Sequence, residues 1–452
     1  SIISILNINI LKIIEKILKI IEKKNVFFGL LLSCLFIIHY SSWKNNQYNT
    51  SNENVYFGGD QWEYQSLAVN ILNGHGYRLG GLEPWEEYKF VFTEKKESKE
   101  YFKSKSFYTF YRTPGYPLFL ASIYKIFGVN PKIVKRIQFL MIVISASIMP
   151  LICYYYYGVT GIFSGIISSF LFMRYFVSDL RTGSILTESL ILLSIIIWMF
   201  IYIYWEKKPT PFRILFLGLA SAFLLLIKGS NIFIPFTFLL FMICKSHLPQ
   251  KNKLLQIITY VLAIVLTILP WSIYASLKSN KSIFLSTQGD TMLVECNNYN
   301  TANTGNWTDL DQFPVEYLWY DRPAGSTMRN VKTFFNFYKE NPSMILLSMK
   351  NKIKFATQYR PIKYCFLFFI LYLITYHISH QFHRKYHFES VNQIFIIIFM
   401  SIIFLTLIFY GNRRMIVPFM YFMLIPSIHF IFISPIYINT LLEKFNLYKK
   451  TD

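Results

Sequence analysis

Three acidic side chains occupy positions from which a carboxylate can accept a proton. Asp60 follows a glycine pair and precedes apolar residues at helical spacing, so we expect a short amphipathic helix that begins there. An acid at this position can cap the helix, or it can act as a general base toward an incoming hydroxyl or amine. Glu63 and Tyr64 lie one turn further and can support Asp60, although a solvated face explains Glu63 more simply. Glu188 follows Thr187 at the start of an apolar run, and an ionisable group at a membrane boundary indicates function.

Four cations stand in comparable places and can bind a phosphate. Arg112 precedes two prolines that open the apolar stretch 115–128, and a cation beside a helix N-terminus is a natural phosphate site. Lys228 separates two apolar runs, where extension of its side chain to the membrane surface explains it equally well. Arg413 and Arg414 occupy a very short connection before the last apolar run. Paired arginines there indicate phosphate binding.

The composition indicates which elements position these residues. Hydrophobic residues make up 54% of the 452 residues and charged residues only 15%, whereas soluble chains carry about 25% charge. The net charge is +21, but the basic residues are spread between apolar runs, which suits anionic lipid surfaces better than nucleic acid. The five cysteines show no metal-binding spacing. We therefore expect an all-α polytopic membrane protein.

The apolar runs predict about ten transmembrane helices, within a range of roughly nine to thirteen. They lie at about 26–41, 137–157, 158–173, 184–205, 212–227, 231–244, 254–275, 364–379, 391–410 and 415–438. The shorter run 115–128 predicts a helix that lies on the membrane surface. A basic amphipathic stretch, 1–25, predicts a second surface helix on the cytoplasmic side.

These runs divide the chain into four parts. The cytoplasmic surface helix is followed by a transmembrane module, 26–275, which includes a long outer segment at 42–136. A second outer segment comprises 276–363, and a three-helix transmembrane segment comprises 364–452. Lys and Arg gather in the short connections on one side, which the positive-inside rule makes cytoplasmic. Both termini are then cytoplasmic, and the two long segments lie outside with the chemistry.

In order, these motifs resemble a known family. Gly-Asp-x-x-x-Tyr-x-x-x-Ala and Gly-x-Gly-Tyr are followed by Arg-x-Pro-x-Tyr-Pro, by Thr-Glu at the start of a span, and by Arg-Arg before a last span that contains proline. The succession is similar to the C-type (GT-C) glycosyltransferases, most closely the branch with bacterial 4-amino-arabinose transferase and the protein O-mannosyltransferases. The resemblance covers about 1–275 and the Arg-Arg segment.

The resemblance implies a transferase of the bacterial plasma membrane whose donor is a sugar linked to a polyprenyl phosphate. The family's acidic base falls on Asp60, and its basic residue near the donor phosphate falls on Arg112. Many relatives have a second acid where this chain has Gln61, so a carboxylate-bound metal is less expected, although a divalent cation is compatible with the scheme. A single displacement would invert the anomeric centre. The acceptor is a lipid, a polysaccharide or a protein.

Two other functions fit the same topology. A polymerase or ligase of lipid-linked glycans would use a diphosphate-linked oligosaccharide and would depend on 276–363 instead of Asp60. A transporter or flippase would favour ionisable residues deep in the spans and an internal repeat. Neither feature is visible in the sequence.

Overall fold

A computed structural model describes residues 32, 34–38, 55–56, 60–82, 90–91, 106–180, 184–244, 250–308, 327–382, 389–409 and 412–448. The surface helix predicted at 1–25 and most of the first predicted span lie outside these ranges.

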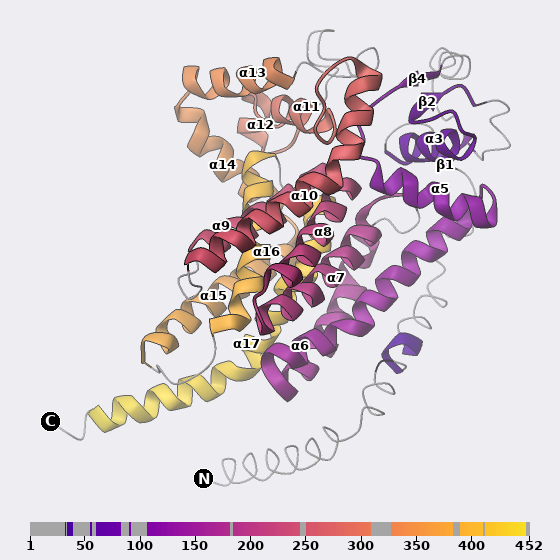
Figure 1. Ribbon diagram of the computed structural model, residues 1–452. Coiled ribbons are helices and arrows are strands. Elements are labelled where there is room, and N and C mark those ends of the chain that lie inside the picture. Colours follow the sequence, from indigo (N-terminus) through magenta and orange to yellow (C-terminus); the bar gives the residue numbers. More distant parts are fainter. Residues whose placement is uncertain are drawn as a thin grey trace.

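The described chain is mostly helical, and its apolar helices form one bundle (Figure 1). The bundle helices are α6 (Pro131–Tyr175), α7 (Glu188–Lys207), α8 (Pro211–Ile227), α9 (Phe233–Cys244), α10 (Gln250–Ser279), α15 (Arg360–Phe382), α16 (Glu389–Ile408) and α17 (Arg413–Tyr448). Among the described residues, four helices are long and apolar enough to cross a membrane: α6, α7, most of α10 and the first half of α17. The helices α8, α9 with the turn before it, and most of α16 are shorter apolar helices. The bundle therefore fits an all-α membrane protein, and the number of ten spans stays a prediction.

Helix α6 contains two of the predicted spans, folded back on each other. Gly158 has a non-helical backbone (φ 60°, ψ −142°) that only glycine adopts easily, so the break predicted between 157 and 158 is confirmed. The second half returns along the first, as a hydrogen bond from the Ser169 hydroxyl to the Ala146 carbonyl oxygen at 2.8 Å shows. A Cβ at Gly161 or Gly165 would collide with the backbone of the first half. The two glycines are four residues apart, a spacing that permits close helix packing.

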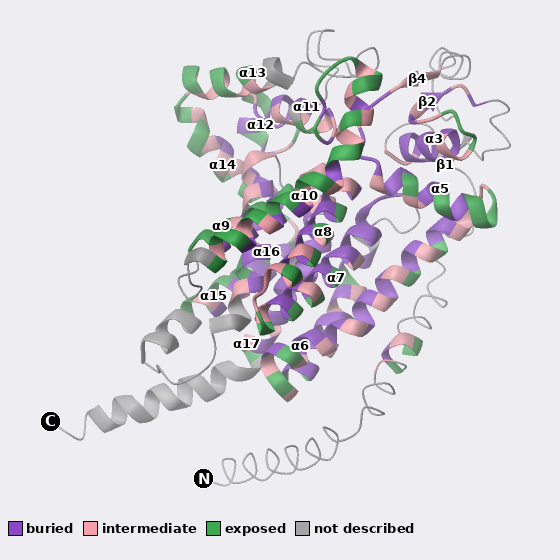
Figure 2. Cartoon of the chain, in the orientation of Figure 1, coloured by how far each residue is buried: buried purple, intermediate pink, exposed green. Residues whose placement is uncertain are grey.

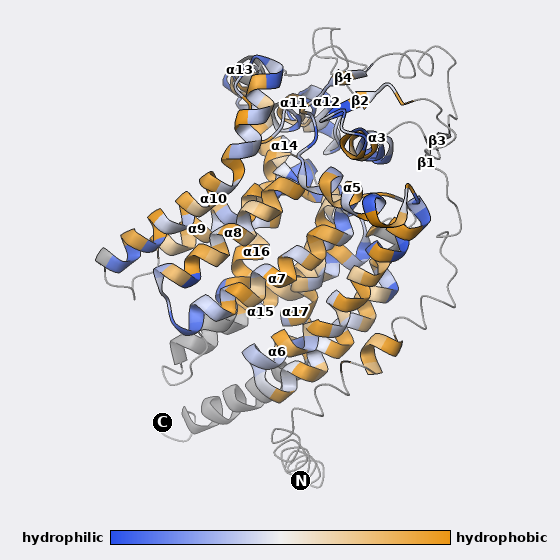
Figure 3. Cartoon of the chain, turned by 45° about the vertical axis from the view of Figure 1, so that its right-hand side comes forward, coloured by the Kyte–Doolittle hydropathy of each residue, from blue (hydrophilic) through white to orange (hydrophobic). Residues whose placement is uncertain are grey.

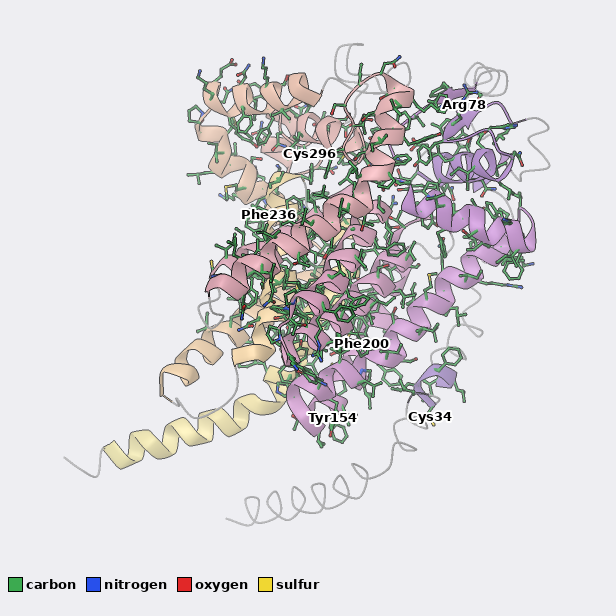
Figure 4. The ribbon with its side chains drawn as sticks, in the orientation of Figure 1. Cys34, Arg78, Tyr154, Phe200, Phe236 and Cys296 are labelled. Carbon is green, nitrogen blue, oxygen red and sulfur yellow. The ribbon has the colours of Figure 1, made fainter. Side chains whose placement is uncertain are left out.

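The helices of the bundle differ in how far they are buried, and α7 is far more buried than α10 (Figure 2). The most apolar stretch of α7 is 72% buried, and Trp198, Tyr202 and Trp205 of this helix pack around Phe238. In α10 the corresponding stretch is only 22% buried. Phe200 of α7 and Phe236 of α9, both labelled in Figure 4, are 40% and 45% exposed. A helix that is apolar on all sides is expected at the centre of such a bundle, whereas α10 lies at its edge.

Polar residues gather at one end of the bundle (Figure 3). The first long segment contributes α3 (Asp60–Leu72), α5 (Gly115–Phe127) and two small sheets. Strand β1 (Val55–Tyr56) pairs in parallel with β3 (Phe90–Val91). Strand β2 (Arg78–Gly80) pairs antiparallel with β4 (Ser106–Tyr108), with Leu79 opposite Phe107. The surface helix predicted at 115–128 is confirmed as a helix by α5.

The described part of the second long segment lies at the same end and is mostly helical, although the sequence predicted no helices within it (Figure 1). It contains α11 (Gln288–Glu295), α12 (Tyr299–Thr304), α13 (Thr327–Glu340) and α14 (Ser343–Ala356). The backbone N–H of Thr287 donates to the Phe110 carbonyl oxygen at 2.9 Å and joins the two segments. Cys296 is buried where α11 and α12 meet (Figure 4). Short helices satisfy backbone groups that an irregular loop would leave unpaired.

Candidate functional site

Four helices begin at one place between the polar end and the bundle. These helices are α3, α5, α7 and α17, and the short turn η2 (Gly229–Ile232) begins beside them, after Lys228. A Cβ at Gly115 would lie 2.6 Å from the Leu226 carbonyl oxygen, so glycine lets the start of α5 meet the end of α8. Each helix N-terminus carries partial positive charge.

Six side chains from these N-termini form a chain of alternating charges. Arg112 donates from Nε to Glu63 Oε2 at 2.5 Å and from Nη2 to Asp60 Oδ1 at 2.5 Å. Arg414 lies 2.6 Å from Asp60 Oδ2 through Nη1 and 2.6 Å from Glu188 Oε1 through Nε. The Nζ of Lys228 lies 3.5 Å from the same Glu188 oxygen. We call the six residues the charge chain: Glu63, Arg112, Asp60, Arg414, Glu188 and Lys228.

The charge chain is balanced and mostly buried. Its three cations equal its three carboxylates, so no net charge is removed from water, which limits the cost of burial. Glu188 is nearly inaccessible, with 1% of its side chain exposed, whereas Asp60 is the most open member at 26% and Arg414 follows at 19%. A ligand that enters from outside therefore meets Asp60 and Arg414 first.

Two polar atoms of the charge chain have no hydrogen-bond partner among the described residues. They are Nη2 of Arg414 and Oε2 of Glu188, and both are buried. A buried polar atom without a partner is costly. The free donor on Arg414, whose side chain is partly exposed, fits an additional acceptor oxygen.

The two carboxylates of α3 have pKa values that move in opposite directions. Burial alone would raise the pKa of Asp60, but the positive charges of Arg112, Arg414 and Lys228 outweigh it and hold this pKa well below its usual range. Burial raises the pKa of Glu63, and the neighbouring Asp60 charge adds to the increase, so Arg112 alone does not offset it. Asp60 is thus a firmly ionised carboxylate, and Glu63 holds its proton more readily.

Aromatic residues fix the position of Arg112. Its guanidinium carbon lies 5.3 Å from the ring centre of Tyr64 and 4.9 Å from that of Tyr111. The hydroxyl of Tyr77 lies 2.9 Å from the Arg112 carbonyl oxygen and 3.0 Å from that of Thr113, and it can donate to either. The segment before α5 is therefore held from both its side chain and its backbone.

The structure brings together seven of the residues that the sequence singled out. They are Asp60, Glu63, Tyr64, Arg112, Glu188, Lys228 and Arg414. The side chain of Arg413 lies outside the described residues. Two sequence-based interpretations are wrong. Glu63 is not on a solvated face, because it is buried and accepts a hydrogen bond from Arg112. Helix α3 is not amphipathic, because its residues 62–70 are all buried. Lys228 extends to Glu188 instead of to the surface.

A buried lysine of α14 escaped the sequence analysis. Lys352 in α14 is fully buried, and its Nζ donates to Asn297 Oδ1 at 2.9 Å and to the Leu407 carbonyl oxygen at 3.0 Å. It lies in a run of alternating lysines, where nothing distinguishes it from its exposed neighbours Lys350 and Lys354. Burial lowers its pKa to about 8.

Most of the polar side-chain atoms of the charge chain contact one another. Within the described ranges, no group of three His, Cys, Asp or Glu side chains gathers in a way that could hold a metal ion. Both oxygens of Asp60 face guanidinium groups. In this arrangement the site fits an anion better than a divalent cation.

Comparison of the chain with protein-family models, with curated proteins and with solved structures gives no match.

Proposed function

We propose that this protein is a membrane glycosyltransferase that moves a sugar from a polyprenyl-phosphate donor to an acceptor on the outer face. The observation that carries the proposal is the charge chain, which sets two arginines and Asp60 where four helices begin, beside an apolar bundle. A lipid-linked donor stays in the bilayer, so its phosphate has to be met at the membrane boundary by cations.

Arg414 and Arg112 are the phosphate ligands in this proposal. Arg414 is partly exposed and has a buried donor without a partner among the described residues, and guanidinium groups bind phosphate oxygens through paired hydrogen bonds. The positive ends of the converging helices favour the same charge. Lys228 adds a third cation, and burial lowers its pKa although the Glu188 charge opposes the decrease.

Asp60 is the base of the reaction. Its two arginines make Asp60 a weak base, because they lower its pKa. A donor phosphate that shares those arginines would weaken their hold on Asp60 and raise its proton affinity. Asp60 then accepts the proton of the acceptor hydroxyl or amine, and the oxygen or nitrogen of the acceptor bonds to the anomeric carbon. The bond from that carbon to the phosphate oxygen breaks, and the electron pair stays on the phosphate, where the arginines stabilise it.

The test is the identity of the lipid that copurifies with the full-length chain. We expect mass spectrometry to find a polyprenyl-phosphate species with the wild type, depleted in Arg112→Gln. The control is Lys339→Gln, an exposed lysine of α13 outside the charge chain, which should retain the lipid. Ordinary phospholipid alone in the wild type would overturn the proposal. A diphosphate-linked oligosaccharide would instead favour a polymerase or ligase.

The Asp60→Asn variant separates binding from chemistry. It should retain the donor and lose transfer by about 100-fold to 10,000-fold, the usual contribution of a general base. Full transfer activity in Asp60→Asn would show that Asp60 is not the base.

A further inference from the structure

A second feature lies away from the charge chain, on the side of the bundle. It is a groove of about 350 Å³ between the end of α6, the start of α15 and the middle of α17. This volume is within the range of small-molecule sites. Its lining is almost entirely apolar, from Leu171 on α6 through Phe368 on α15 to Leu424 and Ile431 on α17.

The groove opens on the outer apolar surface of the bundle. Tyr175, Tyr364 and Ile431 line it and are about half exposed, at 49%, 53% and 45%. An apolar cavity stays dry and takes up apolar molecules. In a bilayer the molecules available at this surface are lipid chains, so an acyl chain can enter from the side.

One end of the groove carries a positive charge. Arg360, the first residue of α15, is its charged lining residue, and none of the described residues that line it is acidic. The groove extends along α15 from Arg360 to Phe368, roughly 12 Å at 1.5 Å per residue. The groove therefore has a cation at the N-terminus of α15 and an apolar lining that continues along this helix. A guanidinium group binds the phosphate of an anionic lipid head group through charge-assisted hydrogen bonds.

We propose that this groove binds one anionic phospholipid of the bilayer, with an acyl chain against α6 and α17 and the phosphate on Arg360. The side chain of Arg360 is exposed, so it can turn toward a phosphate without breaking an internal ion pair. The site is separate from the charge chain and does not depend on the proposed transferase activity.

The experiment is native mass spectrometry of the full-length protein in phosphatidylcholine nanodiscs, with and without phosphatidylglycerol. We expect the wild type to retain one phosphatidylglycerol after release of the loosely bound lipids. Arg360→Gln should bind it about tenfold more weakly, as expected for the loss of one charged hydrogen bond. Ile431→Trp fills the groove from its exposed side and should also displace the lipid.

Two matched variants serve as controls. Ile258→Trp places the same side chain on α10, at a residue of nearly equal exposure, 46% against 45%. Lys339→Gln removes a charge from an exposed residue at the polar end. Both should bind the lipid like the wild type, and all four variants should elute as the same folded species.

Several results would overturn the proposal. Retention in both Arg360→Gln and Ile431→Trp at the wild-type level would show that the lipid lies elsewhere. Retention lost in Arg360→Gln but unchanged in Ile431→Trp would reduce the site to a surface contact of the head group. A polyprenyl phosphate in the groove would overturn the assignment to a bilayer phospholipid.

Discussion

Asp60 and Glu63 contact the same guanidinium from adjacent positions of one helical turn, yet they have different chemistry. Asp60 has an arginine on each oxygen, whereas Glu63 shares one arginine and lies beside the negative charge of Asp60. The difference in their pKa values therefore comes from the number of cations and not from burial, which affects both. Two neutral variants make this difference measurable.

We expect Asp60→Asn to lower the free energy of unfolding by about 3 kcal/mol, the low end of the cost of breaking a buried ion pair. Its loss leaves Arg112 and Arg414 with one carboxylate each. Glu63→Gln should cost less, about 1 to 2 kcal/mol, because Glu63 contacts a single arginine whereas Asp60 contacts two. Denaturation of the purified variants in detergent at neutral pH measures both. Equal losses in the two variants would contradict this assignment.

Arg112 has a role that lysine cannot fill. Its Nε and Nη2 contact two different carboxylates, and an ammonium group has no such fork. Arg112→Lys keeps the charge, and we expect it to weaken binding of a polyprenyl phosphate about tenfold. Titration of that lipid against the wild type, Arg112→Lys and the exposed control Lys339→Gln tests this. Wild-type affinity in Arg112→Lys would leave Arg112 as a structural residue only.

The sequence predicted the members of this site better than their contacts. Each residue is a charged side chain near the start of a helix or apolar run that the sequence predicts, so the sequence alone identifies it as a candidate. Which carboxylate meets which arginine depends on tertiary packing: Glu188 and Arg414 are 226 residues apart. The sequence analysis assigned the arginines to phosphate binding and did not predict their contacts with carboxylates. It also assigned Glu63 to a solvated face and did not predict its contact with Arg112.

At the scale of the elements, the two halves of α6, which form a hairpin, show what a local sequence pattern can predict. The apolar stretch is long enough for two spans, predicted at 137–157 and 158–173, and the backbone of Gly158 confirms the break. The close approach of the two halves was not predicted, because it depends on what lies opposite Gly161 and Gly165. The burial of Lys352 was not predicted either, because it depends on contacts with Asn297 and Leu407, which are distant in the sequence.

Gly165→Ala should destabilise the hairpin, because the new Cβ would lie 2.6 Å from the Pro150 Cα and 3.0 Å from the Cys153 sulfur. We expect a cost of about 1 to 3 kcal/mol, typical of overpacking. Gly289→Ala in α11 is the matched control, since no atom lies within 4 Å of its Cβ position. Thermal unfolding of both variants measures the difference. A smaller loss in Gly165→Ala than in Gly289→Ala would show that the hairpin is loosely packed.

Lys352 connects α14 to the last turn of α16 through the Leu407 carbonyl oxygen. Its pKa falls from the usual lysine value of 10.5 to about 8 in the fold, so between these values the unfolded chain binds a proton that the folded chain does not. Stability contributed by this group therefore rises as the pH increases from about 8 to 10.5. Melting curves should show this rise in the wild type and in Lys354→Met, but not in Lys352→Met. An equal rise in all three would assign it to other groups.

At the scale of the whole molecule, polar chemistry and apolar packing are separated along the bundle. Helices α3 and α11 to α13 lie at one end (Figure 1). The charge chain lies where that end meets the bundle, at the start of α7. From there α7 extends to Lys207, which is followed by Lys208 and Arg213. The prediction of which end faces the cytoplasm uses these basic residues. Chain order and hydropathy predict such a separation, whereas they do not predict that the second polar segment is helical.

Reporter fusions test the orientation. Fusions at Lys208 and at Gln250, where α10 begins, should be fluorescent with a cytoplasmic reporter. Fusions after Gly74 and Gly305 should be active with a reporter that folds only outside. An outside result at both Lys208 and Gln250 would reverse the molecule and place the charge chain on the cytoplasmic side.

The charge chain also has a consequence for biosynthesis. Glu188 opens α7, but Arg414 belongs to α17 and leaves the ribosome 226 residues later. At about 5 to 20 residues per second this interval is roughly 10 to 45 s. During that time Asp60 and Glu188 lack their shared arginine, and Lys228 is the cation that Glu188 meets first. The site is therefore completed only when the last described helix inserts, so a nascent chain can occupy the membrane for many seconds before it can act.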